Sequence, residues 1–153
     1  MKQAGILMLI CLCSSITIFA QEQTRKTTFN LKDGIALQGY DPVAYFSQHK
    51  AVKGNKDLSV YNQGAIYYFS SIENKEAFKK DAAKYEPAYG GWCAYAMGAT
   101  GEKVNVDPGT FKIVNGKLYL FYNKYFNNTL KDWNKDENSL KAKADVNWTK
   151  LFH

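Results

Sequence analysis

The chain has 153 residues, a formal net charge of +6, and a composition that is 46% hydrophobic and 22% charged. This length suits a single domain, and the hydrophobic fraction excludes a globally disordered protein. Three cysteines in a chain of this size exclude a disulfide-dense mini-protein.

The N-terminus has the pattern of a signal peptide. Lys2 precedes an uncharged apolar stretch over 4–13, and the small residue Ala20 is followed by the polar residues 21–23. We therefore predict a signal peptide over 1–20 and an exported protein, either periplasmic or secreted. An uncleaved membrane anchor is the alternative.

The remaining chain divides into two predicted parts. The polar residues 21–34 are expected to form an N-terminal linker, and residues 35–151 are expected to form the domain. Basic residues are spread through both parts without a dense run, which indicates a solvated surface and no nucleic-acid partner. No membrane span is expected after signal removal, and the oligomeric state stays open.

The first predicted elements of the domain are a short helix and a hairpin. Asp41 can cap a helix whose first residue is Pro42, where the missing N–H costs nothing. Two β-branched and aromatic stretches over 58–69 predict an antiparallel hairpin with a three-residue loop at 62–64.

Helical spacing follows this hairpin. Residues 71–85 are predicted to form a helix that begins with a Ser70–Glu73 capping box and ends before Pro87. A short helix over 92–98 comes next, in a stretch of small and aromatic residues.

The C-terminal part is predicted to contain a second hairpin and then helices. Asn115-Gly116 between apolar strands over 110–122 is a strong two-residue turn signal. Phe126 begins an apolar helical repeat, and a further repeat continues to Leu151. The predicted fold class is therefore α+β.

Cys93 is the residue with the most chemical potential. Signal removal would leave it as the chain's one thiol, and the first turn of a helix favours a thiolate. Met97 lies one helical turn further on, so the two sulfur atoms would share a face that suits Cu(I). His49 is the candidate third ligand, although it lies in a polar loop.

Two other interpretations of Cys93 remain open. It could be a redox or nucleophilic thiol, or it could be a buried cysteine that only fills space. The carboxylates show no paired catalytic motif, and we assign no catalytic residue. Whether the protein is an enzyme stays undecided, with a non-enzymatic role favoured.

Aromatic residues make up 15% of the chain, and most of them are expected in the core. Some of them could line an apolar ligand pocket. The candidate pocket residues are Tyr40, Asp41, Tyr68, Tyr89 and Trp92.

The order of several short motifs resembles the YHS domain family, in particular its exported single-domain members. The motifs span about residues 35–151 and comprise GYDPVAYF from Gly39, YYFSS from Tyr67, YGG from Tyr89, Cys93-Ala94, NGKLYL from Asn115, and Ala144-Asp145 with Trp148.

The resemblance implies a link to cysteine-containing metal-binding modules and, for some exported members, to selenoproteins. It therefore favours an exported protein that binds or handles a soft metal, copper first, through Cys93. The alternatives are a non-catalytic module that binds a ligand or protein, and a thiol-redox enzyme. A single cysteine departs from the several thiolates that a metal cage needs.

Overall fold

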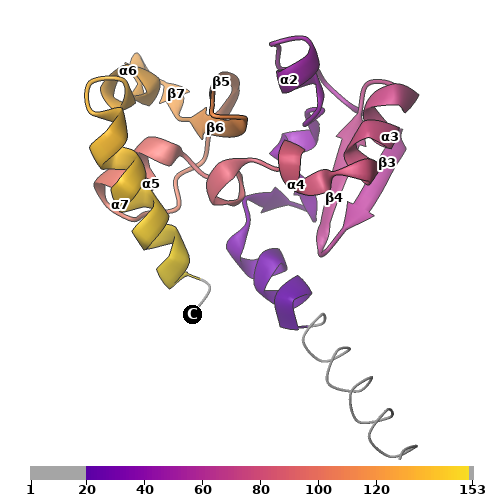
Figure 1. Ribbon diagram of the computed structural model, residues 1–153, viewed down its shortest axis with the longest axis horizontal. Coiled ribbons are helices and arrows are strands. Elements are labelled where there is room, and N and C mark those ends of the chain that lie inside the picture. Colours follow the sequence, from indigo (N-terminus) through magenta and orange to yellow (C-terminus); the bar gives the residue numbers. More distant parts are fainter. Residues whose placement is uncertain (1–19, 152–153) are drawn as a thin grey trace, which may run out of the picture.

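The computed structural model describes residues 20–151. The predicted signal peptide therefore lies outside the described residues, except for Ala20. The described chain is a mixed α+β fold, as predicted, with antiparallel hairpins followed by C-terminal helices (Figure 1).

Residues 20–28 are helical, in the segment where a linker was expected. The helix packs on the domain because Arg25 and Thr28 are buried on one side of it, together with Phe29 just beyond its end. The Arg25 guanidinium lies 4.3 Å from the centre of the Phe29 ring. The segment predicted as a linker therefore includes a helix that packs on the domain.

The main sheet has the strand order β1-β2-β4-β3. Its strands are β1 (Leu31–Lys32), β2 (Ile35–Ala36), β3 (Asn55–Asn62) and β4 (Ala65–Phe69). β2 pairs in parallel with β4, whereas β1–β2 and β3–β4 are antiparallel.

The β3–β4 hairpin was predicted, but its loop has two residues instead of three. Gln63 and Gly64 both have positive φ, and Asn62 pairs with Ala65. A two-residue loop of this handedness matches the twist of the flanking strands.

Between the strands lie the short helices η1 (Leu37–Gly39) and α2 (Ala44–Ser47). After β4, α3 (Ile72–Lys80) and α4 (Ala82–Tyr85) replace the single helix predicted over 71–85. Asp81 separates them because its φ of −154° is not helical. The cap of α3 is Ser71, whose side chain accepts from the Asn74 N–H, and not Ser70.

The helix predicted over 92–98 begins two residues later, as α5 (Ala94–Ala99), and η2 (Ala88–Gly91) precedes it. Cys93 is therefore the residue before α5 and not part of its first turn. The Cys93 backbone N–H donates to the Val104 carbonyl.

The second predicted hairpin is present as β5 (Asp107–Val114) and β6 (Lys117–Phe121), joined by Asn115-Gly116. A small third hairpin follows, β7 (Asn123–Lys124) with β8 (Asn127–Asn128), before α6 (Thr129–Trp133) and α7 (Glu137–Lys150). Phe126 was expected in a helix, but it lies in the β7–β8 turn.

β6 lies between two hydrophobic cores. Leu118 and Leu120 belong to the core under the main sheet, whereas Tyr119 and Phe121 belong to the core under α5 and α7. Alternate residues of a strand point to opposite faces. β6 therefore joins the two halves of the molecule seen in Figure 1.

Candidate functional site

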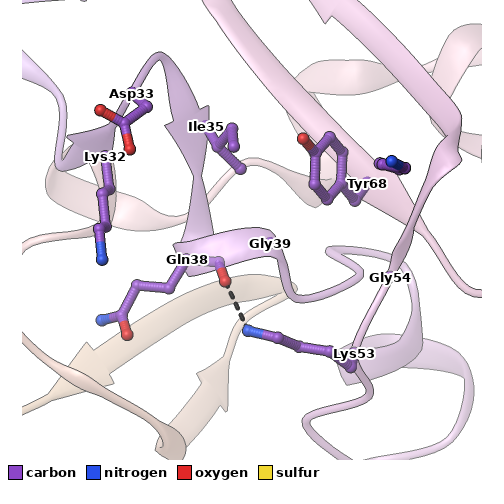
Figure 2. A pocket seen from close by; sticks show the side chains of 9 residues that line it. Lys32, Asp33, Ile35, Gln38, Gly39, Lys53, Gly54 and Tyr68 are labelled. Atoms are coloured by element: carbon purple, nitrogen blue, oxygen red, sulfur yellow. Dashed lines mark hydrogen bonds between the residues drawn. The ribbon is translucent and has the colours of Figure 1, made fainter.

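An open pocket of about 470 Å³ lies at the main sheet, next to the β1–β2 turn (Figure 2). We call it the lysine pocket. Its lining comes from the β1–β2 hairpin, η1, the approach to β3, and β4. The residues are Lys32, Asp33, Ile35, Gln38, Gly39, Lys53, Gly54, Lys56 and Tyr68.

Two glycines let the backbone pass close to Tyr68 at the floor of this pocket. Gly39 has a φ of +79°, and a Cβ there would lie 3.3 Å from the Tyr68 ring. A Cβ on Gly54 would lie 2.5 Å from the Tyr68 carbonyl carbon, which no real side chain tolerates. The Gly54 N–H donates to the Gly39 carbonyl, which fixes the two segments together.

Lys53 is held in place by two contacts. Its ammonium donates to the Gln38 carbonyl oxygen at 2.7 Å and lies 4.2 Å from the centre of the Tyr40 ring. Such a cation–π contact restrains the long side chain and leaves its charge available. Figure 2 shows the Lys32 and Lys53 ammonium groups on the Gln38 side of the pocket, opposite Ile35 and Tyr68.

The charge of the pocket is positive. Lys32, Lys53 and Lys56 stand against the single carboxylate of Asp33, a net charge of 3 − 1 = +2. Among the described residues, none of these four side chains forms an ion pair. The pocket can therefore accept an anionic group.

Asp41 supports this pocket from beneath and does not line it. The carboxylate is fully buried, and one of its oxygens accepts the backbone N–H groups of Val43 and Ala44. The other oxygen accepts the Ser70 N–H, the Ser70 hydroxyl and the Asn74 amide. These bonds hold the segment with Tyr40 against the end of β4.

The five predicted pocket residues do not share one pocket. Tyr68 lines the lysine pocket, Tyr40 contacts its Lys53, and Asp41 fixes the adjoining loop. Tyr89 lines a separate hollow, and the Trp92 indole N–H donates to the Thr28 carbonyl at 2.7 Å. The predicted pocket residues therefore lie in two places, one at the lysine pocket and one beside the helix over 20–28.

The separate hollow, about 380 Å³, lies between the helix over 20–28 and α7. Its polar groups are mutually paired: the Tyr89 hydroxyl donates to Asp145 at 2.9 Å, and Arg25 forms an ion pair with Glu86. Burial, and next the bond to Asp145, raises the pKa of Tyr89 above its ordinary value.

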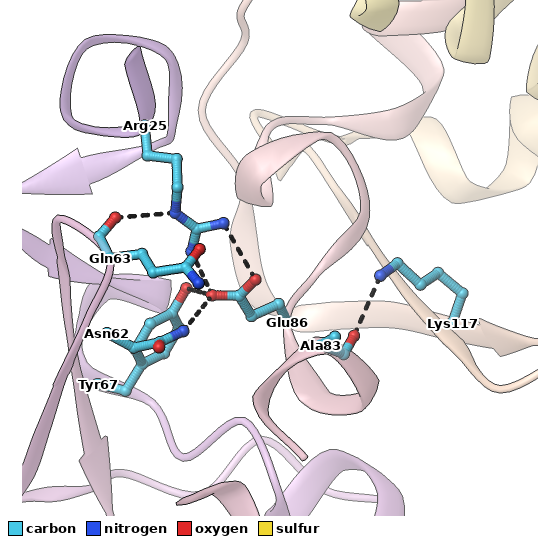
Figure 3. Close-up of polar contacts among 7 residues, drawn as sticks. All are labelled: Arg25, Asn62, Gln63, Tyr67, Ala83, Glu86 and Lys117. Atoms are coloured by element: carbon cyan, nitrogen blue, oxygen red, sulfur yellow. Dashed lines mark hydrogen bonds and ion pairs between the residues drawn. The ribbon is translucent and has the colours of Figure 1, made fainter. Parts of the chain in front are cut away.

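Glu86 gathers donors from three parts of the chain (Figure 3). It accepts from Arg25, from the Tyr67 hydroxyl at 2.8 Å, and from the Asn62 amide at 3.1 Å. Arg25 also donates to the Gln63 carbonyl. This Glu86 cluster fixes the helix over 20–28 to the β3–β4 hairpin, so its role is structural.

Cys93 has no exposed surface, although it is among the residues that line an open hollow of about 330 Å³ beside α5, and its thiol takes part in a set of hydrogen bonds. Its Sγ accepts the Tyr122 N–H at 3.4 Å and lies 3.4 Å from the Thr129 hydroxyl oxygen. The Thr129 hydroxyl donates to the Tyr122 carbonyl at 3.0 Å. The thiol proton is therefore the group that points to Thr129, and Cys93 joins β6, α5 and α6.

Of the predicted metal ligands, Cys93 and Met97 lie one helical turn apart and His49 lies away from both. Cys93 and Met97 are both fully buried but belong to different cores, and His49 is exposed after α2. Figure 1 shows α2 and α5 well apart. Residues 20–151 contain no group of three or more His, Cys, Asp or Glu side chains that could hold a metal ion.

Sequence reasoning missed the lysines of the pocket. Lys32, Lys53 and Lys56 look like ordinary surface residues, and they meet only because β2 pairs in parallel with β4 at Ile35 and Ile66. The available signals were the Asp33-Gly34 turn and the glycine before Tyr40, neither of which indicates pairing across the sheet.

No protein-family model matches this chain, and no curated protein or solved structure matches it either. The resemblance to the YHS domain family therefore stays a prediction.

Proposed function

We propose that this protein is a non-catalytic binding module for a small anionic molecule with an apolar part, held in the lysine pocket. The observation that carries the proposal is that three lysines, none in an ion pair among the described residues, line one pocket of about 470 Å³.

The chemistry of the pocket suggests how such a ligand would bind. The Lys32 and Lys53 ammonium groups would pair with a carboxylate or phosphate, and the Gln38 side chain lies beside them. The Tyr68 ring and Ile35 would contact the apolar part. The lining includes no Ser, Thr, Cys or His side chain, which favours binding over chemistry.

The test is a titration with benzyl phosphate, benzoate and benzylamine, followed by calorimetry and amide NMR shifts. Both anions should bind in the pocket and benzylamine should not. Lys53→Gln should weaken benzyl phosphate binding about fivefold, the effect of one lost charge-assisted contact. Higher salt should weaken it further.

Lys80→Gln is the matched control, because Lys80 is exposed on α3, outside the pocket. It should bind benzyl phosphate as the wild type does. Equal binding of benzylamine, an equal loss in Lys80→Gln, or shifted amides outside the lysine pocket would overturn the proposal.

The proposal assigns Cys93 a structural role, which a second experiment tests. Iodoacetamide should leave Cys93 unmodified in the native protein and modify it after denaturation, since its Sγ is buried. Mass spectrometry of the tryptic peptide 85–103 separates this thiol from Cys11 and Cys13. Fast native modification would favour the thiol-redox alternative.

The copper hypothesis depends on Cys93 more than on any other residue, since Cys93 is its one thiolate ligand and His49 is exposed after α2. Under our proposal, Cu(I) titration against a competing chelator should give the same binding for the wild type and Cys93→Ser. Stoichiometric binding lost only in the variant would instead support a metal-handling function.

A further inference from the structure

The β7–β8 hairpin ends in two aromatic side chains that contact no other ring among the described residues. Tyr125 is 88% exposed and Phe126 is fully exposed, at 111%. They are the two most exposed large hydrophobic side chains of residues 20–151. We call the pair the aromatic tip.

The backbone of the aromatic tip is as unusual as its exposure. Tyr125 and Phe126 have φ of +52° and +64°, the left-handed region that favours glycine and asparagine. The β5–β6 hairpin has Asn115 and Gly116 at the equivalent positions, with φ of +51° and +72°. Left-handed backbone costs an aromatic residue about 1–2 kcal/mol.

The fold therefore gains no burial from these two residues, and they occupy a turn conformation that asparagine and glycine adopt at lower cost. Strained backbone at an exposed site is a reason to look for a function outside the chain.

Two lysines that form no ion pair among the described residues flank the aromatic tip in the chain. Lys124 precedes it and Lys131 lies on α6, both exposed and in no ion pair among the described residues. The acidic groups on neighbouring elements are Asp132, which pairs with Lys135, Glu102, and Asp107 on β5, which accepts hydrogen bonds from the Gly109 N–H and the Thr110 hydroxyl. Figure 1 shows β7 and α6 together at one end of the molecule.

We propose that the aromatic tip is an anchor for an anionic membrane surface. Phe126 and Tyr125 enter the boundary between headgroups and acyl chains, where amphipathic rings are favoured, and Lys124 and Lys131 contact the headgroups. A convex tip of two residues is far smaller than the ~800 Å² that each partner buries in a standard protein interface.

A helix that could cross a bilayer is not found within residues 20–151. The proposed contact is peripheral, and one pair of side chains makes it weak and reversible.

The decisive variant is Tyr125→Asn with Phe126→Gly, which copies the turn of the β5–β6 hairpin. The protein is purified after export, its N-terminus is read by mass spectrometry, and all variants are compared in that same form. Wild type should bind vesicles of phosphatidylcholine with phosphatidylglycerol. The variant should bind at least about tenfold more weakly, the loss expected from one buried aromatic ring.

The same variant should melt a few degrees higher than wild type, since its turn is relaxed. Lost binding therefore cannot be attributed to unfolding. Lys124→Gln and Lys131→Gln should each weaken binding about fivefold. Ile72→Ser, at a hydrophobic side chain that is 63% exposed on α3, should leave binding unchanged.

A residue-resolved measurement locates the contact. A spin-labelled lipid in the same vesicles should broaden the amide signals of residues 124–127 before any others. Equal binding to neutral vesicles, unchanged binding of the Asn-Gly variant, or broadening confined to other residues would overturn the proposal. Binding of the aromatic tip to another protein, without binding to vesicles, would overturn it too.

Discussion

At the scale of single residues, Asp41 shows how one buried carboxylate can organise a pocket that it does not line. Its five accepted hydrogen bonds come from two backbone N–H groups on its own loop and from Ser70 and Asn74. The loop carries Tyr40, whose ring restrains Lys53. The lysine pocket therefore depends on the hydrogen bonds that Asp41 accepts.

Asp41→Asn should lower the free energy of unfolding by about 2–4 kcal/mol, because one oxygen becomes an NH₂ group that faces other donors. Urea unfolding measures the loss. Ser70→Ala removes only part of the network and should cost about 1 kcal/mol. An Asp41→Asn variant as stable as wild type would show that the carboxylate charge is not needed.

Cys93 illustrates the limit of inference from residue type. Its identity and spacing to Met97 predicted a metal pair, but the two side chains are buried in different cores. The surroundings of the Cys93 thiol depend on how β6 and α6 pack around it, which a four-residue spacing does not indicate.

At the scale of elements, α5 and α7 pack closely through a glycine. A Cβ on Gly98 would lie 2.4 Å from the Leu140 carbonyl oxygen, a backbone atom that cannot move alone. Two effects of Gly98→Ala oppose each other: alanine favours the helix by about 1 kcal/mol, whereas overpacking typically costs 1–3 kcal/mol.

We expect the steric effect to dominate, so Gly98→Ala should lower the midpoint of thermal unfolding. Gly116→Ala is the comparison, because nothing lies within 4 Å of its Cβ and its cost arises only from a φ of +72°. If Gly98→Ala stabilised the protein, α5 and α7 would have to be further apart than described here.

Local signals predicted most of the elements. The Asn115-Gly116 dipeptide predicted the β5–β6 hairpin, and the pairing of Val114 with Lys117 across it confirmed the prediction. Pairing between distant segments is not indicated by any local motif in the sequence. The parallel register of Ile35 and Ile66 and the buried Arg25 of the helix over 20–28 depend on the whole fold. The lysine pocket arises from that register, so it was not predicted.

At the scale of the whole molecule, the two cores share β6 and each contains buried tyrosines. Burial is the largest cause that raises the pKa of Tyr45, Tyr67, Tyr89 and Tyr119 above the ordinary 10.0. Tyr67 also donates to Glu86, whose negative charge raises its pKa further.

These shifts predict a loss of stability at high pH. In the unfolded chain the four tyrosines ionise near the ordinary pKa of 10.0, whereas in the folded chain they stay neutral. Their contribution is thus complete below pH 10 and declines as the pH rises above it. Alkali should therefore unfold the protein before all eleven tyrosines have ionised.

Tyrosinate absorbance and far-ultraviolet circular dichroism, followed together as the pH is raised, test this expectation. The last part of the absorbance increase should coincide with the loss of secondary structure. Tyr67→Phe removes one of the groups that favours the unfolded state at high pH, so its stability should fall less steeply with pH than that of wild type. Tyr125→Phe, at an exposed ring, should follow the wild-type slope. Complete ionisation of the tyrosines in a protein that keeps its secondary structure would contradict the buried positions of these hydroxyls.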